Sequence, residues 1–275
     1  MKYLLYNPLS NNGKCRKAAD KLNKKFNKKG HKTQLLSLID ISSDINSFVN
    51  KLETSDEIYV IGGDGTLHHV INSFPLDTLP CKVYYYSAGH GNDFAREYKE
   101  KIINLSEKAS RLPYFKIPTG QVVKFINGVG LGVDADVCKV VKDEQKSYIS
   151  AALTCLKRYQ PYSIDINIDG IEHHFDNVFF FVVMNGKYIG GGMKIAPHAK
   201  RDDDHLDLLV ITSKNYKRLL PLFPFVFLGW HTKSKKHAHE FKCKKVFAKL
   251  SRNQNLQSDG EVISDISEIE VFLPQ

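Results

Sequence analysis

Apolar residues follow two alternating patterns in the first part of the chain, up to about residue 112. Short apolar runs predict buried strands, and segments with an apolar residue every three or four positions predict amphipathic helices. This alternation predicts a parallel sheet covered by helices, in which ligands bind at the carboxyl ends of the strands. Strands are expected at residues 3–6, 33–38, 58–61 and 82–87, with helices after residue 14 and over residues 45–52.

Beyond residue 113 the apolar runs are short, and several alternate with polar residues as in antiparallel strands. Asp169-Gly170, between two such runs, predicts a tight hairpin turn. A helix is expected over about residues 144–159. The second half is therefore mostly antiparallel β, with a domain boundary near residues 112–120, and a cleft between the domains is the default ligand site. Strands are expected at residues 122–127, 164–168, 171–175, 178–184, 206–211, 246–250 and 269–273.

The apolar run at residues 58–61 leads into a glycine-rich turn. Glycines let the backbone turn tightly and bring its N–H groups to an anion, and a helix that begins near Thr66 attracts phosphate at its N-terminus. The turn therefore predicts a site for a nucleotide triphosphate, in which Asp64 holds magnesium against the phosphate chain or orients the donor directly. The alternative is a plain connection between strand and helix. The residues of the turn are Gly62, Gly63, Asp64, Gly65 and Thr66.

The strand at residues 82–87 delivers a second small polar loop to the same edge of the sheet. The loop contains Gly89, His90, Gly91, Asn92 and Asp93. Asn92 and Asp93 are good helix N-caps, and that role alone explains Asp93. Two glycine-bearing loops, each with an aspartate at one sheet edge, favour a shared binding site.

Composition places the chain among globular proteins. It has 275 residues, 42% of them hydrophobic, and a formal net charge of +9. No run reaches the roughly 20 apolar residues of a membrane span, and the apolar start is too short for a secretion signal, so a cytoplasmic protein is expected. The five cysteines stand singly without a CxxC pair, which argues against a zinc site or a disulfide framework.

Two acidic groups in the second half are candidates for chemistry. Four carboxylates fall within six residues, at Asp202, Asp203, Asp204 and Asp207. Oxygen ligands suit Mg²⁺ or Ca²⁺, and an exposed acidic turn is an equally good interpretation. Asp259-Gly260-Glu261 places a carboxylate on each side of a glycine, and alone it could be an ordinary Asp-Gly turn.

Seven short segments occur in a characteristic order along the chain. They are Asn7-Pro8-x-Ser10, Gly62 to Thr66, Gly89 to Arg96, Gly190-Gly191-Gly192-Met193, Asp202-Asp203, Gly229-x-His231 and Asp259-Gly260-Glu261. Together they resemble the catalytic family of the diacylglycerol kinases, which includes bacterial lipid kinases and, as eukaryotic relatives, sphingosine and ceramide kinases. The resemblance covers nearly the whole chain.

The resemblance implies an α/β nucleotide-binding domain at residues 1–117 and a β-sandwich domain for the lipid substrate at residues 118–275. ATP, with Mg²⁺, would donate its γ-phosphoryl group to a lipid hydroxyl, such as that of diacylglycerol, in the interdomain cleft. Asp259 matches the general base, and Glu261 matches a residue linked to nucleotide or magnesium binding. Asp203, with Asp202, matches a structural magnesium site. The nucleotide side is assigned to Asn7, Gly62, Gly63, Asp64, Gly65, Thr66, His90, Asn92 and Asp93.

The chain departs from the family pattern near the phosphate loop. His69 stands where the family usually has glutamate, His68 stands where asparagine is common, and His90 replaces a Gly-Thr pair. These histidines motivate a second hypothesis, a catalytically silent homologue that binds nucleotide or lipid. A kinase for a soluble substrate is the third. The identity of the lipid cannot be read from the sequence, because acyl-chain pockets are built from interchangeable apolar side chains.

Residues 219–230 form the most apolar segment, with basic residues on both sides. Core packing is the preferred interpretation, and an interfacial surface that includes Trp230 and collects lipid from an anionic membrane is the alternative. The expected partners are a lipid substrate, an anionic membrane contacted peripherally at its inner face, and a second copy of the chain in a homodimer. Nucleic acid is not expected, because the basic residues are not interleaved with aromatic ones.

Overall fold

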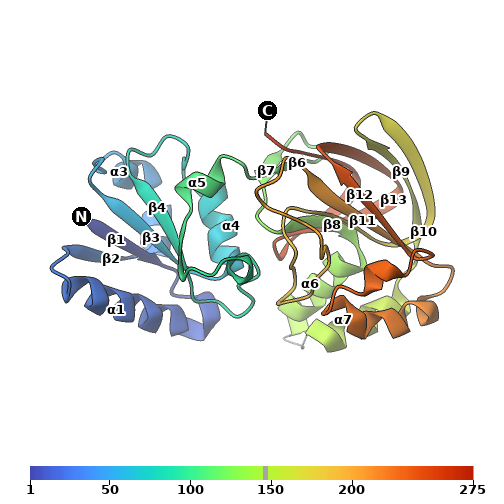
Figure 1. The fold of residues 1–275 in the computed structure, drawn as a ribbon, viewed down its shortest axis with the longest axis horizontal. Helices are drawn as coiled ribbons and strands as arrows, with labels where there is room; N and C mark the ends of the chain where they lie inside the picture. Colours follow the sequence, from blue (N-terminus) through green and yellow to red (C-terminus); the bar gives the residue numbers. More distant parts are fainter. Residues whose placement is uncertain (145–147, 275) are drawn as a thin grey trace. The chain divides into compact units, whose positions relative to one another are not determined.

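The computed structural model describes residues 1–144 and 148–274. The chain divides into two compact units, Met1–Arg111 and Leu112–Gln275, which are described separately (Figure 1). Unit 1 contains the glycine-rich turn, and unit 2 contains Asp259. Among the described residues, no helix is long and apolar enough to cross a membrane.

Unit 1 is built on a five-stranded sheet in the order β2-β1-β3-β4-β5. Strands β1 to β4 are parallel, and β5 is antiparallel to β4. The parallel α/β architecture predicted from the sequence is therefore confirmed. The elements are β1 (Lys2–Tyr6), η1 (Ser10–Gly13), α1 (Lys14–Asn27), β2 (Thr33–Ser37), α2 (Leu38–Ser42), α3 (Ile45–Val49), β3 (Glu57–Gly62), α4 (Asp64–Ser73), β4 (Lys82–Ser87), η2 (Ala95–Glu97), β5 (Ile102–Asn104) and α5 (Ser106–Ala109).

Different helices cover the two faces of this sheet (Figure 1). On one face, α1 packs Ala19, Leu22 and Phe26 against Leu4 and Tyr59. Helix α4 lies against the other face and buries its own apolar stripe there. Because β1, β3 and β4 are parallel, the loops that follow them come to the same edge of the sheet.

Unit 2 contains an antiparallel sheet for which nine strands are described, with the path β12-β11-β10-β8-β13-β14-β6-β7. The antiparallel β-sandwich expected for the second domain is confirmed. The elements are β6 (Tyr114–Lys116), β7 (Val122–Lys124), β8 (Gly128–Gly132), α6 (Val133–Glu144), α7 (Tyr148–Arg158), β9 (Tyr162–Ile168), β10 (Ile171–Met184), β11 (Leu206–Thr212), η3 (Tyr216–Arg218), η4 (Leu220–Val226), η5 (His231–Lys233), β12 (Ala238–Cys243), β13 (Lys245–Ser258) and β14 (Glu261–Phe272).

The two long strands β10 and β13 close this sheet around its core. Each pairs with β9 over its first half and with β8 over its second half. The enclosed side chains are apolar and fully buried, among them Phe115, Leu131 and Phe181. Helices α6 and α7 lie side by side next to the sheet and pack on each other through Val137, Ala151 and neighbouring residues (Figure 1).

The hairpin predicted at Asp169-Gly170 is confirmed. Ile168 of β9 pairs with Ile171 of β10, and the two turn residues have φ values of 49° and 94°. Such left-handed backbone at both central positions is typical of the two-residue turns that join antiparallel strands.

The strand expected over residues 122–127 is shorter than predicted and ends at Lys124. Its last residues leave the sheet because the backbone N–H groups of Ile126 and Asn127 donate to the carboxylate of Asp259. A contact between positions so distant in sequence cannot be recognised from a local apolar pattern.

Other expected elements of unit 2 differ in extent. The helix expected over residues 144–159 corresponds to α7, and the expected residues 145–147 lie outside the described part. Helix α6 is not among the expected elements, because its valines favour strands. The basic residues after the apolar segment 219–230 lead into the strand β12, whose Ala238 and Cys243 are buried.

Candidate functional site

Three loops of unit 1 meet at the carboxyl ends of β1, β3 and β4. From the first loop, Asn7 Nδ2 donates to Thr66 Oγ1 at 3.4 Å, in the first turn of α4, which directly follows the loop after β3. Asn11 Nδ2 donates to the carbonyl oxygen of Ala88 at 2.9 Å, in the loop after β4. Side chains of the first loop therefore contact the segments that follow both β3 and β4.

Two close contacts explain why glycines stand in these loops. A Cβ on Gly89 would lie 2.4 Å from Gly63 Cα, and a Cβ on Gly62 would lie 2.4 Å from Thr66 Cβ. Neither distance is sterically allowed, so a larger residue at position 89 would push two loops apart, and one at position 62 would displace Thr66 in the first turn of α4. Gly65 differs, because a Cβ there meets no atom within 4 Å. The first turn of α4 is therefore open at Gly65, where a helix N-terminus can receive an anion.

Asp64 links the loop after β3 to the loop after β4. Its Oδ2 accepts from the backbone N–H of Asp93 and its Oδ1 from that of Phe94, both at 3.0 Å. Charge-assisted bonds of this kind are stronger than neutral ones, so the carboxylate clamps the second loop at the start of α4. No local pattern in the sequence indicates this clamp, because it joins two segments far apart in the chain. A role for Asp64 in holding magnesium or the donor stays a prediction.

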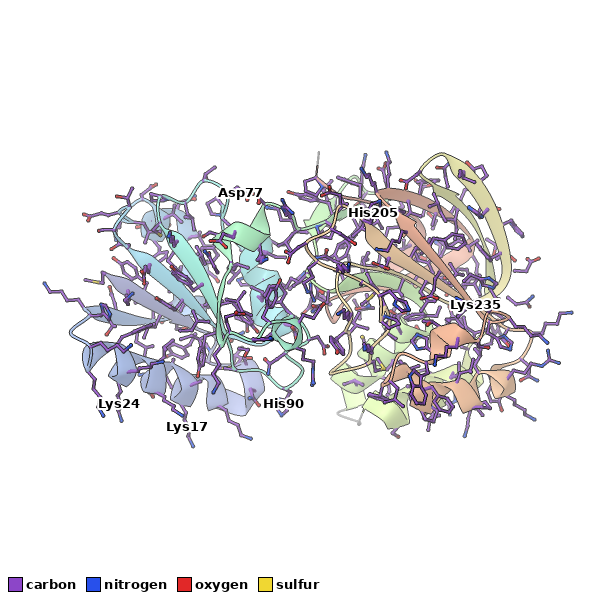
Figure 2. All side chains as sticks on the ribbon, in the orientation of Figure 1. Lys17, Lys24, Asp77, His90, His205 and Lys235 are labelled. Carbon is purple, nitrogen blue, oxygen red and sulfur yellow. The ribbon has the colours of Figure 1, made fainter. Side chains whose placement is uncertain are left out.

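Asn92 shapes the loop after β4 from within. It adopts a φ of 50°, its Oδ1 accepts from the N–H of Gly89 at 2.9 Å, and its Nδ2 donates to the carbonyl oxygen of Gly89 at 2.8 Å. Its neighbour Asp93 is 4% exposed, with a carboxylate oxygen 3.4 Å from Arg96 Nε. His90 of the same loop is exposed (Figure 2). Contacts of these residues with nucleotide stay predictions.

The three histidines near the glycine-rich turn occupy different positions. His69 lies with Nε2 3.1 Å from Ser42 Oγ and Nδ1 3.4 Å from Ser73 Oγ, so it connects α4 to α2 and to the end of α4. His68 is half-buried on the same helix. Only His90 lies in one of the loops at the sheet edge.

Asp259 lies in the turn between β13 and β14 and is 9% exposed. Its Oδ2 accepts from the N–H of Ile126 at 2.7 Å, and its Oδ1 accepts from those of Asn127 at 2.8 Å and Gly128 at 3.4 Å. The N–H of Asp259 donates to the carbonyl oxygen of Gly128 at 3.2 Å. The carboxylate is therefore fixed in one position, and backbone dipoles compensate its charge.

The segment that holds Asp259 is itself held by two polar side chains. Arg201 donates from Nη1 to the carbonyl oxygen of Ile126 and from Nη2 to Asn127 Oδ1 at 2.6 Å. Asn185 Nδ2 donates to the same carbonyl oxygen at 2.9 Å. No local pattern in the sequence indicates a role for Arg201 or Asn185, although Arg201 directly precedes the acidic turn at Asp202.

A second carboxylate is buried close to this turn. Asp134, in the first turn of α6, is 7% exposed, and burial raises its pKa to about 7. The polar side chain of Gln257 lies beside it and opposes this rise of the pKa. Gln257 Oε1 also accepts from the N–H of Gly260 at 3.2 Å, so Gln257 connects the buried acid to the turn. Glu261, on the other side of Gly260, is exposed.

The acidic turn after Arg201 is engaged with a lysine. Asp203 Oδ2 accepts from Lys242 Nζ at 3.0 Å, and its Oδ1 accepts from the N–H of His205 at 3.3 Å. Within residues 1–144 and 148–274, no group of three or more His, Cys, Asp or Glu side chains is arranged to hold a metal ion. Metal binding by Asp203 and Asp202 stays a prediction.

Comparison with protein families accounts for both units. Residues 2–124 match the family model described as the diacylglycerol kinase catalytic domain, and residues 127–275 match that described as the YegS C-terminal NAD kinase beta sandwich-like domain. The chain belongs to the diacylglycerol kinase catalytic family. The predicted resemblance is thereby confirmed. Membership of this kinase family supports phosphotransferase activity.

One relative and two solved structures show how far this similarity reaches. The diacylglycerol kinase of Bacillus subtilis strain 168 is 26% identical over 271 residues, which cover 94% of this chain and 88% of the relative. A crystal structure of a diacylglycerol kinase from Bacillus anthracis Sterne superposes with a TM-score of 0.66 at 19% identity, covering 100% of this chain and 93% of the other. An NAD kinase from Archaeoglobus fulgidus in complex with ATP gives 0.51 at 12% identity, with coverages of 100% and 91%. The two structures establish a shared fold.

Proposed function

We propose that the chain is an ATP-dependent lipid kinase that transfers the γ-phosphoryl group to a lipid hydroxyl, such as that of diacylglycerol. The observation that carries the proposal is the interlocked edge of unit 1, with its open helix N-terminus at Gly65, in a member of this kinase family. The lipid acceptor is supported by the name of the Bacillus subtilis relative.

The nucleotide is assigned to the loops of unit 1. Backbone N–H groups in the first turn of α4 suit the phosphate chain, and the space at Gly65 allows its close approach. The neighbour from Archaeoglobus fulgidus, whose structure contains ATP, supports nucleotide use in this fold. Magnesium would neutralise charge on the transferred phosphoryl group, and one or two carboxylates with phosphate oxygens commonly hold it. Glu261, which is exposed in unit 2, is the carboxylate that we assign to this task.

Asp259 is assigned as the base that receives the proton of the acceptor hydroxyl. An ionised carboxylate only accepts hydrogen bonds, as Asp259 does from the N–H of Ile126, so its oxygens suit a group that receives a proton. The clamps on both oxygens hold the carboxylate still, which suits a reaction in which positioning supplies most of the catalysis. Arg201 and Asn185 keep Ile126 and Asn127 in place and so position the base.

Two other functions remain as alternatives that the same assay separates. A silent homologue would bind ATP without turnover. The exposed His90, in the loop after β4, motivates this alternative. A kinase for a soluble substrate is suggested by the fold shared with NAD kinase. Peripheral contact with an anionic membrane and formation of a homodimer belong to the lipid-kinase proposal.

The test is incubation of the purified chain with γ-labelled ATP, magnesium and either a total lipid extract or diacylglycerol in mixed micelles. The proposal expects a labelled lipid product that requires magnesium and is lost in Asp259→Asn. ATP binding without a labelled product across a broad lipid panel would favour the silent homologue. Label transfer to NAD but not to lipid would favour the soluble-substrate kinase.

A further inference from the structure

Residues 214–236 of unit 2, here called the interfacial segment, are basic and apolar without any acidic residue. The six basic residues lie at its two ends. They are Lys214, Lys217, Arg218, Lys233, Lys235 and Lys236. Between them the chain forms the 3-10 turns η3 and η4 and continues through Trp230 into η5.

The inner side of the interfacial segment is anchored in unit 2. Leu219 is buried with Leu156 and Phe179, Phe223 packs against the α6–α7 pair, and Val226 packs against the cluster beside β10 and β11. The core-packing interpretation therefore holds for these side chains. It does not account for the outer ones.

Four large apolar side chains of the segment are exposed, with fractions of 42% for Phe225, 39% for Phe227, 54% for Leu228 and 51% for Trp230. They are four of the ten exposed large hydrophobic side chains in the described part of the chain, and they fall within six positions. Single exposed apolar residues need no explanation, but a cluster rimmed by polar residues marks an interaction site.

These outer side chains are held in place. The rings of Phe225 and Trp230 stack with centroids 6.1 Å apart, and the N–H of Trp230 donates to the carbonyl oxygen of Phe225 at 3.0 Å. Gly229 has a φ of 73°, and a Cβ there would lie 2.8 Å from Pro197 Cβ, so the backbone of the turn packs directly against Pro197. Lys233 Nζ lies 5.0 Å from the Trp230 ring centroid. Aromatic rings and a cation are thus presented together.

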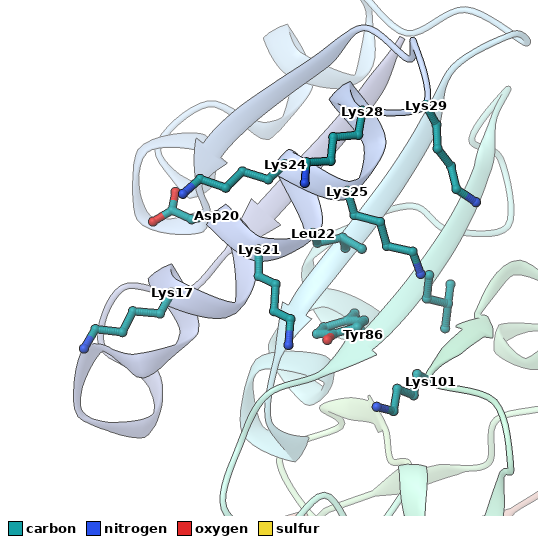
Figure 3. A pocket seen from close by; sticks show the side chains of 11 residues that line it. Lys17, Asp20, Lys21, Leu22, Lys24, Lys25, Lys28, Lys29, Tyr86 and Lys101 are labelled. Atoms are coloured by element: carbon teal, nitrogen blue, oxygen red, sulfur yellow. The ribbon is translucent and has the colours of Figure 1, made fainter.

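A second basic surface, beside α1 in unit 1, provides a contrast. It borders a cavity of about 900 Å³ lined by lysines, which include Lys17, Lys24 and Lys28 (Figure 3). Lys17 and Lys24 point away from the helix into solvent (Figure 2). The apolar side chains of this cavity, such as Leu22, are not exposed. This surface can attract anions but offers nothing to insert into a bilayer.

We propose that the interfacial segment docks the chain on an anionic lipid bilayer. Phe225, Phe227, Leu228 and Trp230 enter the headgroup level, where tryptophan is favoured, and the six basic residues face anionic headgroups. A bilayer fits because the segment combines exposed aromatic side chains with cations and itself contains no acidic residue. Lys235 pairs with Glu240, outside the segment, at 3.0 Å, so the other five basic residues carry most of the attraction to anionic lipid. Docking itself requires no catalysis. Only its purpose, to bring a lipid kinase to its substrate, rests on the proposed function.

Trp230 is the only tryptophan in the sequence, so its fluorescence reports on this surface alone. The experiment mixes the full chain, without ATP, with vesicles of phosphatidylcholine or of phosphatidylcholine with a third of phosphatidylglycerol. We expect sedimentation with the anionic vesicles, a blue shift of the emission, and quenching by lipids brominated near the headgroup. Absence of sedimentation, or sedimentation with unquenched Trp230, would overturn the assignment.

Two variants and two matched controls locate the surface. Phe225→Ala with Phe227→Ala, and Lys217→Gln with Arg218→Gln and Lys233→Gln, should each weaken vesicle binding about tenfold or more. The controls remove an exposed apolar side chain elsewhere, Ile171→Ala, and three lysines of α1, Lys17→Gln with Lys24→Gln and Lys28→Gln. We expect each control within about twofold of the parent chain, since neither changes the docking surface.

The outcomes also distinguish a bilayer from a second copy of the chain as the partner of this surface, and docking from catalysis. A control that weakens binding as much as the variants contradicts the assignment, as does a dimer in solution that the Phe225 and Phe227 changes abolish. Phosphorylation of a short-chain diacylglycerol below its aggregation limit is measured in parallel. Docking without phosphorylation would refute the proposed function alone, and phosphorylation without docking would refute the surface alone.

Discussion

Unit 2 contains two Asp-Gly hairpin turns with nearly the same local structure. Asp169 and Gly170 have φ values of 49° and 94°, and Asp259 and Gly260 have values of 50° and 93°. In each turn the aspartate carboxylate accepts from backbone N–H groups of another segment, and its own N–H donates to a carbonyl oxygen of that segment. The same dipeptide therefore builds the same clamp twice.

The two turns differ in their surroundings. Asp169 is exposed and holds the N–H groups of Lys244 and Lys245. Asp259 is 9% exposed and holds residues 126–128, which Arg201 and Asn185 support from the other side. An Asp-Gly dipeptide therefore specifies a turn and a clamp. Burial and supporting side chains distinguish the turn at Asp259, to which we assign the catalytic base.

The largest effect is expected for Asp259→Asn. An amide can still accept one backbone N–H but cannot take a proton from the acceptor, so phosphoryl transfer should fall by about 10²–10⁴-fold. The free energy of unfolding should also fall, by about 1–3 kcal/mol, because the amide N–H₂ cannot satisfy the remaining buried donors. Measured kcat, the KM for ATP and thermal unfolding separate the two effects. A lower kcat at unchanged KM for ATP supports the base assignment.

Asp64→Asn extends the comparison to the carboxylate clamp of unit 1. The amide can satisfy only one of the N–H groups of Asp93 and Phe94, so the loop after β4 should loosen and ATP affinity should fall about tenfold, equivalent to about 1.4 kcal/mol. Calorimetric titration with ATP measures this directly. Asp20→Asn, on α1 of the same unit, serves as the control. Unchanged ATP affinity in Asp64→Asn would show that the clamp does not shape the nucleotide site.

The variant Asp134→Asn tests how much the buried carboxyl group beside the Asp259 turn lowers the free energy of unfolding. The pKa of Asp134 is raised by burial from 3.8 to about 7, so the folded chain binds a proton more tightly than the unfolded chain. Wild-type stability should therefore fall as pH rises from about 4 to about 7 and level off above that, and the neutral amide should remove this fall. At pH 8 the variant should be more stable than wild type by about 1–3 kcal/mol, with little difference near pH 4. Denaturant unfolding at the two pH values checks the sign, and equal stability at pH 8 would contradict it.

The smallest effects are expected for Gly170→Ala and Gly260→Ala. In both turns an added Cβ meets no atom within 4 Å, so only the left-handed backbone is strained, at about 1 kcal/mol each. Thermal unfolding should show equal losses for the two variants. Kinase activity should fall only for Gly260→Ala, because that turn carries Asp259. Unequal stability losses would mean that the turns are less alike than their dihedral angles indicate.

The parts predicted from sequence are those that depend on local patterns. The parallel sheet of unit 1 and the hairpin at Asp169-Gly170 follow from apolar periodicity and turn chemistry. The clamp by Asp64 and the support by Arg201 were missed, because each joins segments that only the folded chain brings together. The end of β7 at Lys124 was missed for the same reason. Motif residues indicate where a loop is special, and their bonding partners have to come from the structure.

The most direct test compares Asp259→Asn with Asp169→Asn in the same transfer assay, with labelled ATP, magnesium and diacylglycerol in mixed micelles. Both variants alter a clamping aspartate in an Asp-Gly turn, and only one removes the proposed base. We expect wild-type transfer by Asp169→Asn. At ATP concentrations that saturate the variant, we expect almost no transfer by Asp259→Asn. Wild-type transfer by a folded Asp259→Asn, or the same loss in both variants, would contradict the assignment of Asp259 as the base.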